Sequence, residues 1–107
     1  MSFPVGTILQ IKRDKAATHK IKVTSVDGRT FTATYVDAPG DTSVFTGEIR
    51  ARENQVLSLL QHHPDKGYAA FHVATDKTNT AGKKYYAGSW YDVSGHEGLK
   101  FELDPLS

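Results

Sequence analysis

Short runs in which apolar and polar residues alternate recur along this chain, and each run ends at turn-forming residues. HKIKVTSV, residues 19–26, is one such run, and RTFTATYV, residues 29–36, is the next, with its phenylalanine, alanine and tyrosine on one face. Asp27-Gly28 lies between the two runs, and this dipeptide is a strong signal for the turn of a hairpin. The sequence therefore predicts an antiparallel hairpin.

The same alternation continues through most of the chain. Further runs are VGTILQIKRD (5–14), SVFTGEI (43–49), YAAFHVAT (68–75), KYYAGSWYD (84–92) and LKFEL (99–103). The last two runs flank Ser94-Gly95-His96-Glu97-Gly98, so residues 83–103 are expected to form a hairpin. Short strands at regular spacing predict a mostly β fold, a small antiparallel up-and-down barrel of about seven or eight strands.

One segment fits two structures. EIRARENQVLSLLQHHP, residues 48–64, can form a pair of strands with Leu57 and Leu59 on one face. It can equally form a short helix near 50–62, in which Glu48 stands four residues before Arg52. Short apolar runs are not settled by periodicity, so helix and strand both remain open for residues 48–62.

Composition limits the class of protein. The chain has 107 residues and is expected to form a single domain, residues 1–107. Its net charge of +1 gives no field that recruits nucleic acid or an anionic membrane, and the lack of cysteine excludes disulfides and thiolate chemistry. No apolar stretch is long enough for a spanning helix. We expect a soluble protein of the cytoplasm, with secretion after removal of a signal segment as the alternative.

Aromatic residues concentrate in residues 83–103, which hold three of the five tyrosines and the single tryptophan. Tyr86 and Trp90 share one strand face, whereas Tyr85 and Tyr91 share the other. One interpretation is a packed core with incidental exposed tyrosines. The other is a ligand cavity inside a barrel and a subunit contact outside it, which predicts a homo-oligomer.

Several of these segments resemble the avidin family, and such motifs recur in lipocalin-like barrels. The similar segments are TATYVDAPG (32–40), FTGEI (45–49), AFHVATDKTN (70–79) and YYAGSWY (85–91). The resemblance implies that Tyr35 takes the place of the tyrosine that hydrogen-bonds the biotin ureido oxygen. It also implies that Phe71 and Tyr86 stand where the family has cavity-lining tryptophans. Gln10 replaces the family's asparagine, so biotin is expected to bind weakly or not at all.

Residues suited to metal or catalytic chemistry do not form a convincing motif. His62 and His63 are adjacent, so on a strand only one of them can share a site with His72. Ser89 lies within a predicted strand and lacks the elbow that exposes a serine nucleophile, although Asp92 and His96 follow it. We therefore expect no catalytic residues, no metal, no cofactor, no nucleic acid and no membrane partner.

The sequence points to a non-catalytic binding protein whose barrel cavity or mouth accepts a small ligand or a glycan. Tyr35 is expected to donate or accept a hydrogen bond, and Phe71, Tyr86 and Trp90 are expected to form the apolar wall. The alternative is a protein–protein interaction module, an inhibitor or an assembly subunit, that uses the exposed aromatic faces of its strands.

Overall fold

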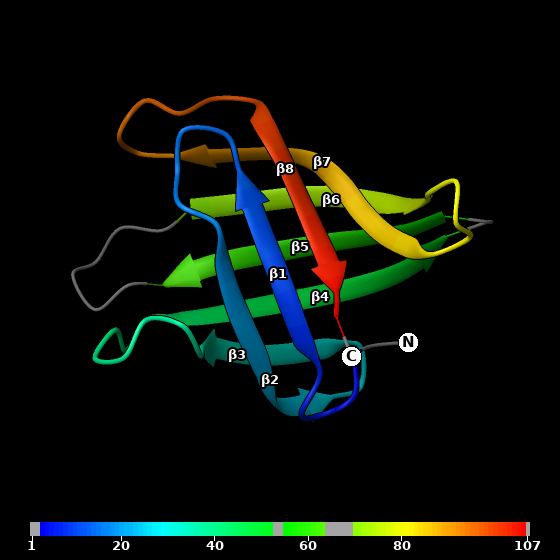
Figure 1. Cartoon of the computed structure of the whole chain (residues 1–107), viewed down its shortest axis with the longest axis horizontal. Helices are drawn as coiled ribbons and strands as arrows, with labels where there is room; N and C mark the ends of the chain where they lie inside the picture. The colour runs from blue at the N-terminus through cyan, green and yellow to red at the C-terminus, as the bar shows by residue number, and fades with distance from the viewer. Residues whose placement is uncertain (1–2, 53–54, 64–69, 107) are drawn as a thin grey trace.

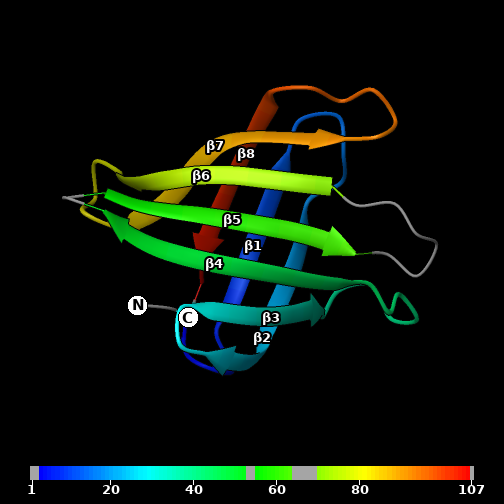
Figure 2. The same cartoon turned by 180° about the vertical axis from the view of Figure 1, so that it is seen from behind.

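The chain folds into a closed antiparallel β-barrel. This computed structural model describes residues 3–52, 55–63 and 70–106. Each strand pairs with the next in sequence and β8 pairs with β1, so the sheet closes on itself (Figures 1 and 2). The strands are β1 Ile8–Arg13, β2 His19–Asp27, β3 Thr30–Tyr35, β4 Val44–Arg52, β5 Gln55–His63, β6 Ala70–Thr78, β7 Lys84–Asp92 and β8 Leu99–Pro105.

The predicted up-and-down barrel is confirmed, and the helical alternative is wrong. No residue that the structure describes near 50–62 is helical, because β4 and β5 pair from Val44↔His63 to Arg52↔Gln55. β5 also pairs with β6 on its other side. Two flanking strands satisfy its backbone groups, and this decides between two structures that the apolar pattern alone does not separate. No helix among the described residues is long and apolar enough to cross a membrane.

Both predicted hairpins are present. β2 and β3 pair up to Asp27↔Thr30, and Gly28 in the turn between them has φ 60°. β7 and β8 pair across the loop of residues 93–98, in which Gly95 and Gly98 have φ of 102° and 65°. These angles lie in the left-handed region, which glycine adopts without strain. Glycine therefore sets the position of both turns.

Alternate residues of each strand fill the barrel with side chains. Leu9 and Ile11 settle the inward face of the first run, which the sequence leaves unclear, and both are fully buried. Further fully or almost fully buried apolar residues lie on the faces that alternation predicts, among them Ile21, Val23, Phe31, Ala33, Phe45, Ile49, Phe101 and Leu103. On β6 the buried residues are the small Ala70 and Ala74 instead of the larger Phe71 and Val73. The centre of the barrel is thus a packed core.

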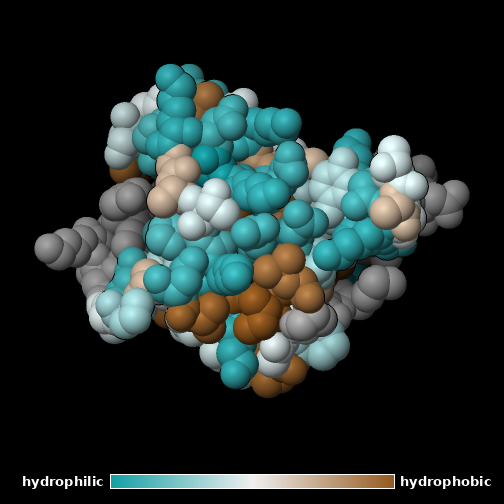
Figure 3. All heavy atoms as spheres, in the orientation of Figure 1, coloured by the Kyte–Doolittle hydropathy of each residue, from teal (hydrophilic) through white to brown (hydrophobic). Residues whose placement is uncertain are grey.

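The end of the barrel next to the chain termini is closed by an aromatic residue. Phe3 packs edge-on against Phe31, with ring centroids 5.3 Å apart, and against Tyr86 at 5.6 Å. The segment that carries Phe3 is tied to β2 by a hydrogen bond from Gly6 N to Val23 O. The face over β1, β2 and β8 is largely hydrophilic, with an apolar group beside the termini (Figure 3).

The opposite end carries the longer connections. The segments after β1, β3 and β7 lie at this end, on the left and upper left of Figure 1, and β5 also ends here. The strand ends beneath these loops carry polar residues on their inward faces, in contrast with the apolar centre. We call this the loop end.

Candidate functional site at the loop end

A pocket of about 340 Å³ opens at the loop end of the barrel. Side chains from five strands form its wall: Arg13 of β1, Tyr35 of β3, His62 of β5, Ala70 of β6, and Trp90 and Asp92 of β7. The loops add Lys15, Ala16, Asp41, Ser94 and His96. We call the strand residues the floor of the pocket and the loop residues its rim.

Strand register brings the floor together. Phe45 pairs with His62, His62 with Ala70, and Ala70 with Asp92, so these four residues form one row around the inside of the barrel. The ring of His62 stacks on Phe45 with centroids 4.5 Å apart and planes within 10°. Alanine at position 70 leaves space between His62 and Asp92. The small residue therefore contributes to the hollow in an otherwise filled barrel.

Arg13 extends the inward face of β1 beyond Ile11 and enters the pocket from its side. Its guanidinium carbon lies 5.4 Å from the centre of the Trp90 ring, a cation–π distance, and Nη1 lies 3.5 Å from His72 Nε2. It also forms a hydrogen bond with the Tyr35 hydroxyl. A positive charge is thus held among aromatic rings at the floor.

Burial changes the acid–base properties of two rings in the wall. Burial, followed by the positive charge of Arg13, lowers the pKa of His62 to about 4. The imidazole is therefore neutral at neutral pH. Burial raises the pKa of the Tyr35 phenol above its usual value, although Arg13 opposes this shift. Among these groups Arg13 is the one that carries charge near pH 7.

Three buried nitrogens of the wall have no hydrogen-bond partner among the described residues: Arg13 Nε, His62 Nε2 and Trp90 Nε1. His62 and Trp90 are only 7% and 2% exposed. Buried polar groups are normally paired, because leaving one unpaired costs free energy. Three such groups lie in residues around one pocket.

Asp92 and His96 organise the loop after β7. Asp92 Oδ1 accepts hydrogen bonds from the backbone amides of Ser94 and His96, and His96 Nδ1 lies 2.9 Å from the carboxylate. Burial raises the pKa of Asp92, but the hydrogen bonds from His96 and Ser94 outweigh it and leave the pKa below its usual value. The His96 ring stacks over Trp90 at 4.6 Å. The loop is thus fixed against the floor.

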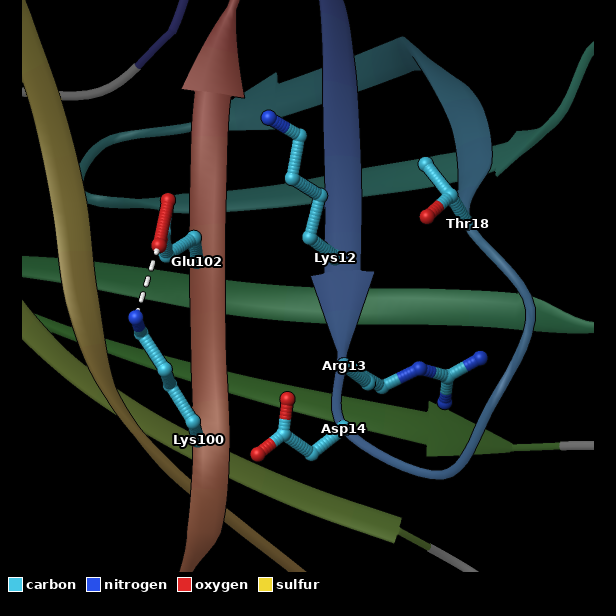
Figure 4. A pocket seen from close by; sticks show the side chains of 6 residues that line it. All are labelled: Lys12, Arg13, Asp14, Thr18, Lys100 and Glu102. Carbon is cyan, nitrogen blue, oxygen red and sulfur yellow. Dashed lines mark ion pairs between the residues drawn. The ribbon is translucent and has the colours of Figure 1, made fainter.

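A second depression, of about 240 Å³, lies outside the barrel wall (Figure 4). Lys12 and Arg13 of β1 and Lys100 and Glu102 of β8 line it with Asp14 and Thr18, and Lys100 Nζ lies 3.6 Å from Glu102 Oε1. The side chain of Arg13 extends away from this pair in Figure 4. Its lysines are well exposed, so the depression is a solvated charged surface.

The structure separates the four predicted ligand-binding residues. Tyr35 and Trp90 line the loop-end pocket. Tyr86 shares the inward face of β7 with Trp90, but it lies at the opposite end against Phe3. Phe71 is 43% exposed and lies on the outer face of β6, because Ala70, His72 and Ala74 face the interior.

Three pocket residues occupy positions that the sequence did not predict. Arg13 and His62 form the floor, and His96 reaches Trp90 from the loop. Ser89 lies on the outer face of β7, away from Asp92 and His96. Among the described residues, no group of three histidine or carboxylate side chains is placed to hold a metal ion. The parity of Arg13 with Leu9 and Ile11 was the signal available for its inward position.

The closed barrel agrees with the expectation of a small β-barrel, and its strand order is that of an up-and-down barrel. Comparison of the chain with protein-family models, with curated proteins and with solved structures finds no match.

Proposed function

We propose that this protein is a non-catalytic binding protein that accepts a small organic ligand in the loop-end pocket. One observation carries the proposal: the residues around a 340 Å³ pocket include buried side chains whose polar nitrogens have no partner among the described residues. Pockets of this size that combine aromatic walls with a few convergent polar groups are typical of small-molecule sites.

The surroundings of Trp90 favour a small ligand over an oligosaccharide. Sugar rings stack on open aromatic faces, whereas Trp90 is 2% exposed and has Arg13 and His96 against its ring. The resemblance to the avidins contributes one element to the proposal, which is the placement of Tyr35 beside the ligand. The engagement of Asp92 by loop amides supports a structural role for this carboxylate.

Fluorescence of Trp90 tests the proposal directly, because it is the only tryptophan in the chain. We expect a panel of small organic compounds, with biotin and oligosaccharides included, to contain members that change the emission saturably. Biotin is expected to bind weakly or not at all. Phe71→Ala is the control, since Phe71 lies outside the barrel, and it should leave the response unchanged. If no compound shifts Trp90 emission, the binding function is wrong.

A second candidate function rests on the outer surface of β6 and β7. Phe71 and Tyr91 are cross-strand partners, and each is 43% exposed. An exposed aromatic pair of this kind is typical of protein contact surfaces. We propose an interaction module as the alternative, and it is favoured if no small compound changes Trp90 emission.

A further inference from the structure

The geometry points to a small organic carboxylate as the ligand of the loop-end pocket, with its carboxylate group held by Arg13. This inference rests on the proposed binding function and adds the chemical class of the ligand. It depends on three features: the lack of a carboxylate partner for Arg13, the unpaired nitrogens in the surrounding wall, and the charges at the rim.

Arg13 is a half-buried cation without a carboxylate partner among the described residues. Its contacts are the Trp90 ring at 5.4 Å, His72 Nε2 at 3.5 Å and the Tyr35 hydroxyl. Outer cations behave differently: Lys12 lies 4.0 Å from Asp104, and Lys84 lies 3.7 Å from Asp76. A partly buried guanidinium that forms no ion pair attracts an anion, because charge interactions strengthen as water is excluded.

The nitrogens around Arg13 match a group that only accepts hydrogen bonds. Arg13 Nε and Trp90 Nε1 each carry one N–H that donates and cannot accept, and both lack a partner among the described residues. A carboxylate presents two oxygens in one plane, which is the arrangement that a guanidinium binds through two parallel hydrogen bonds. A neutral amide supplies one such oxygen and brings donors of its own, which Arg13 does not satisfy.

The rim favours a ligand with a single negative charge. Asp41 and Asp92 line the same pocket, and Lys15 is the other cation beside it. The two carboxylates repel a dianion, such as a phosphate monoester, about twice as strongly as they repel a monoanion. A single carboxylate also matches the charge of one guanidinium. The pocket volume of about 340 Å³ exceeds what a carboxylate group alone fills. The ring of Tyr35 and the methyl group of Ala70 offer contact to an apolar remainder.

Matched acids and amides test the inference, with Trp90 emission as the readout. The probes are benzoate against benzamide, 3-phenylpropionate against its amide, hexanoate against hexanamide, and inorganic phosphate. We expect at least one acid to bind about tenfold or more tightly than its amide. Arg13→Gln should abolish that preference. Lys12→Gln removes the same charge from the adjacent, outward-facing residue, and it should preserve the preference.

The outcomes separate this inference from the proposed function. If amides bind as tightly as their acids, the carboxylate assignment is wrong and the binding function stands. If phosphate binds more tightly than every acid, the site is a phosphate site and the assignment is equally wrong. If no probe of either kind changes the emission, the inference is rejected together with binding of these compounds. Comparison of acid and amide on the unmodified protein remains decisive even if Arg13→Gln does not fold.

Discussion

His62 places a neutral imidazole between an aromatic ring and a cation. Its pKa in the folded protein is about 4, whereas an unperturbed histidine titrates near 6.5. Between these two values the unfolded chain binds more protons than the folded one. The free energy of unfolding should therefore fall as pH drops from roughly 6.5 to roughly 4, by on the order of 2 kcal/mol. Urea unfolding across this range measures the change.

His62→Phe isolates this contribution. Phenylalanine can stack on Phe45 and has no ionisable group, so the variant should lose most of the dependence on pH in this window. His63→Gln is the matched control, because His63 is exposed. Lowered pKa values of Asp37, Asp41 and Asp92 reduce stability only at lower pH, as these carboxylates become protonated. An unchanged pH profile in His62→Phe would contradict the assignment.

Tyr35 and Arg13 form a polar contact in the pocket wall. The sequence predicted a hydrogen-bonding role for Tyr35 and none for Arg13. The Tyr35 hydroxyl accepts a hydrogen bond from Arg13 and lies in the pocket wall, so it can orient the guanidinium or meet the ligand. Tyr35→Phe should weaken binding of the best acid by about 1 kcal/mol, because one hydrogen bond is lost and the ring remains. The same Trp90 titration measures it. Affinity equal to that of the unmodified protein would show that this hydroxyl has no part in binding.

Between elements, one close contact joins β3 and β4. Phe31 pairs with Gly47, and the ring of Phe31 covers the glycine so closely that a β-carbon at position 47 would overlap it. Gly47→Ala should therefore lower the free energy of unfolding by about 1 to 3 kcal/mol, since Phe31 is fully buried and has little space to move. Chemical denaturation measures this loss.

A second variant identifies the cause of that loss. Phe31→Leu shortens the side chain over position 47, so Gly47→Ala should cost less in the Phe31→Leu background than alone. If the two substitutions add without coupling, the loss comes from the strand backbone and overlap with the ring is not its source.

Strand alternation predicted most of the elements, because a strand in a barrel wall places successive side chains alternately in the apolar interior and in solvent. It assigned Trp90 and Tyr86 to one face of β7. Four residues along a strand span about 13 Å, so the two side chains belong to different ends of the barrel. Alternation shows only which face a residue lies on, so it could not show this separation. On β6 alternation separated Phe71 and Val73 from Ala70 and Ala74, but the expected inward position of Phe71 is wrong, because the smaller alanines face the interior. Bulky rings from neighbouring strands fill the interior, and small residues of β6 face them.

The residues of the pocket could not be predicted from any single segment of the sequence. Arg13 and His62 are 49 positions apart in the chain, and closure of the barrel brings them to one end. Sequence alternation can place Arg13 inward beside Ile11. It cannot show which residues of seven other strands meet it, because that follows from register and closure together.

For the molecule as a whole, closure decides how copies can associate. Every strand of the barrel is paired on both sides, so association through strand edges is removed and contact must come from outward side chains. Phe71, Val73 and Tyr91 form an exposed apolar group on β6 and β7, which lie side by side in Figure 2. We call these three residues the β6–β7 patch.

We predict that the protein forms a homo-oligomer through the β6–β7 patch, because a symmetric contact lets the same apolar surface cover its copy. Sedimentation across a dilution series should show an assembly at high concentration that dissociates on dilution. Phe71→Ser combined with Tyr91→Ser should shift the protein to the monomer at every concentration. Val26→Ser is the control, because Val26 is similarly exposed but lies on β2. A monomer at high micromolar concentration, with the patch intact, would reject the oligomer and leave the patch without a role in self-association.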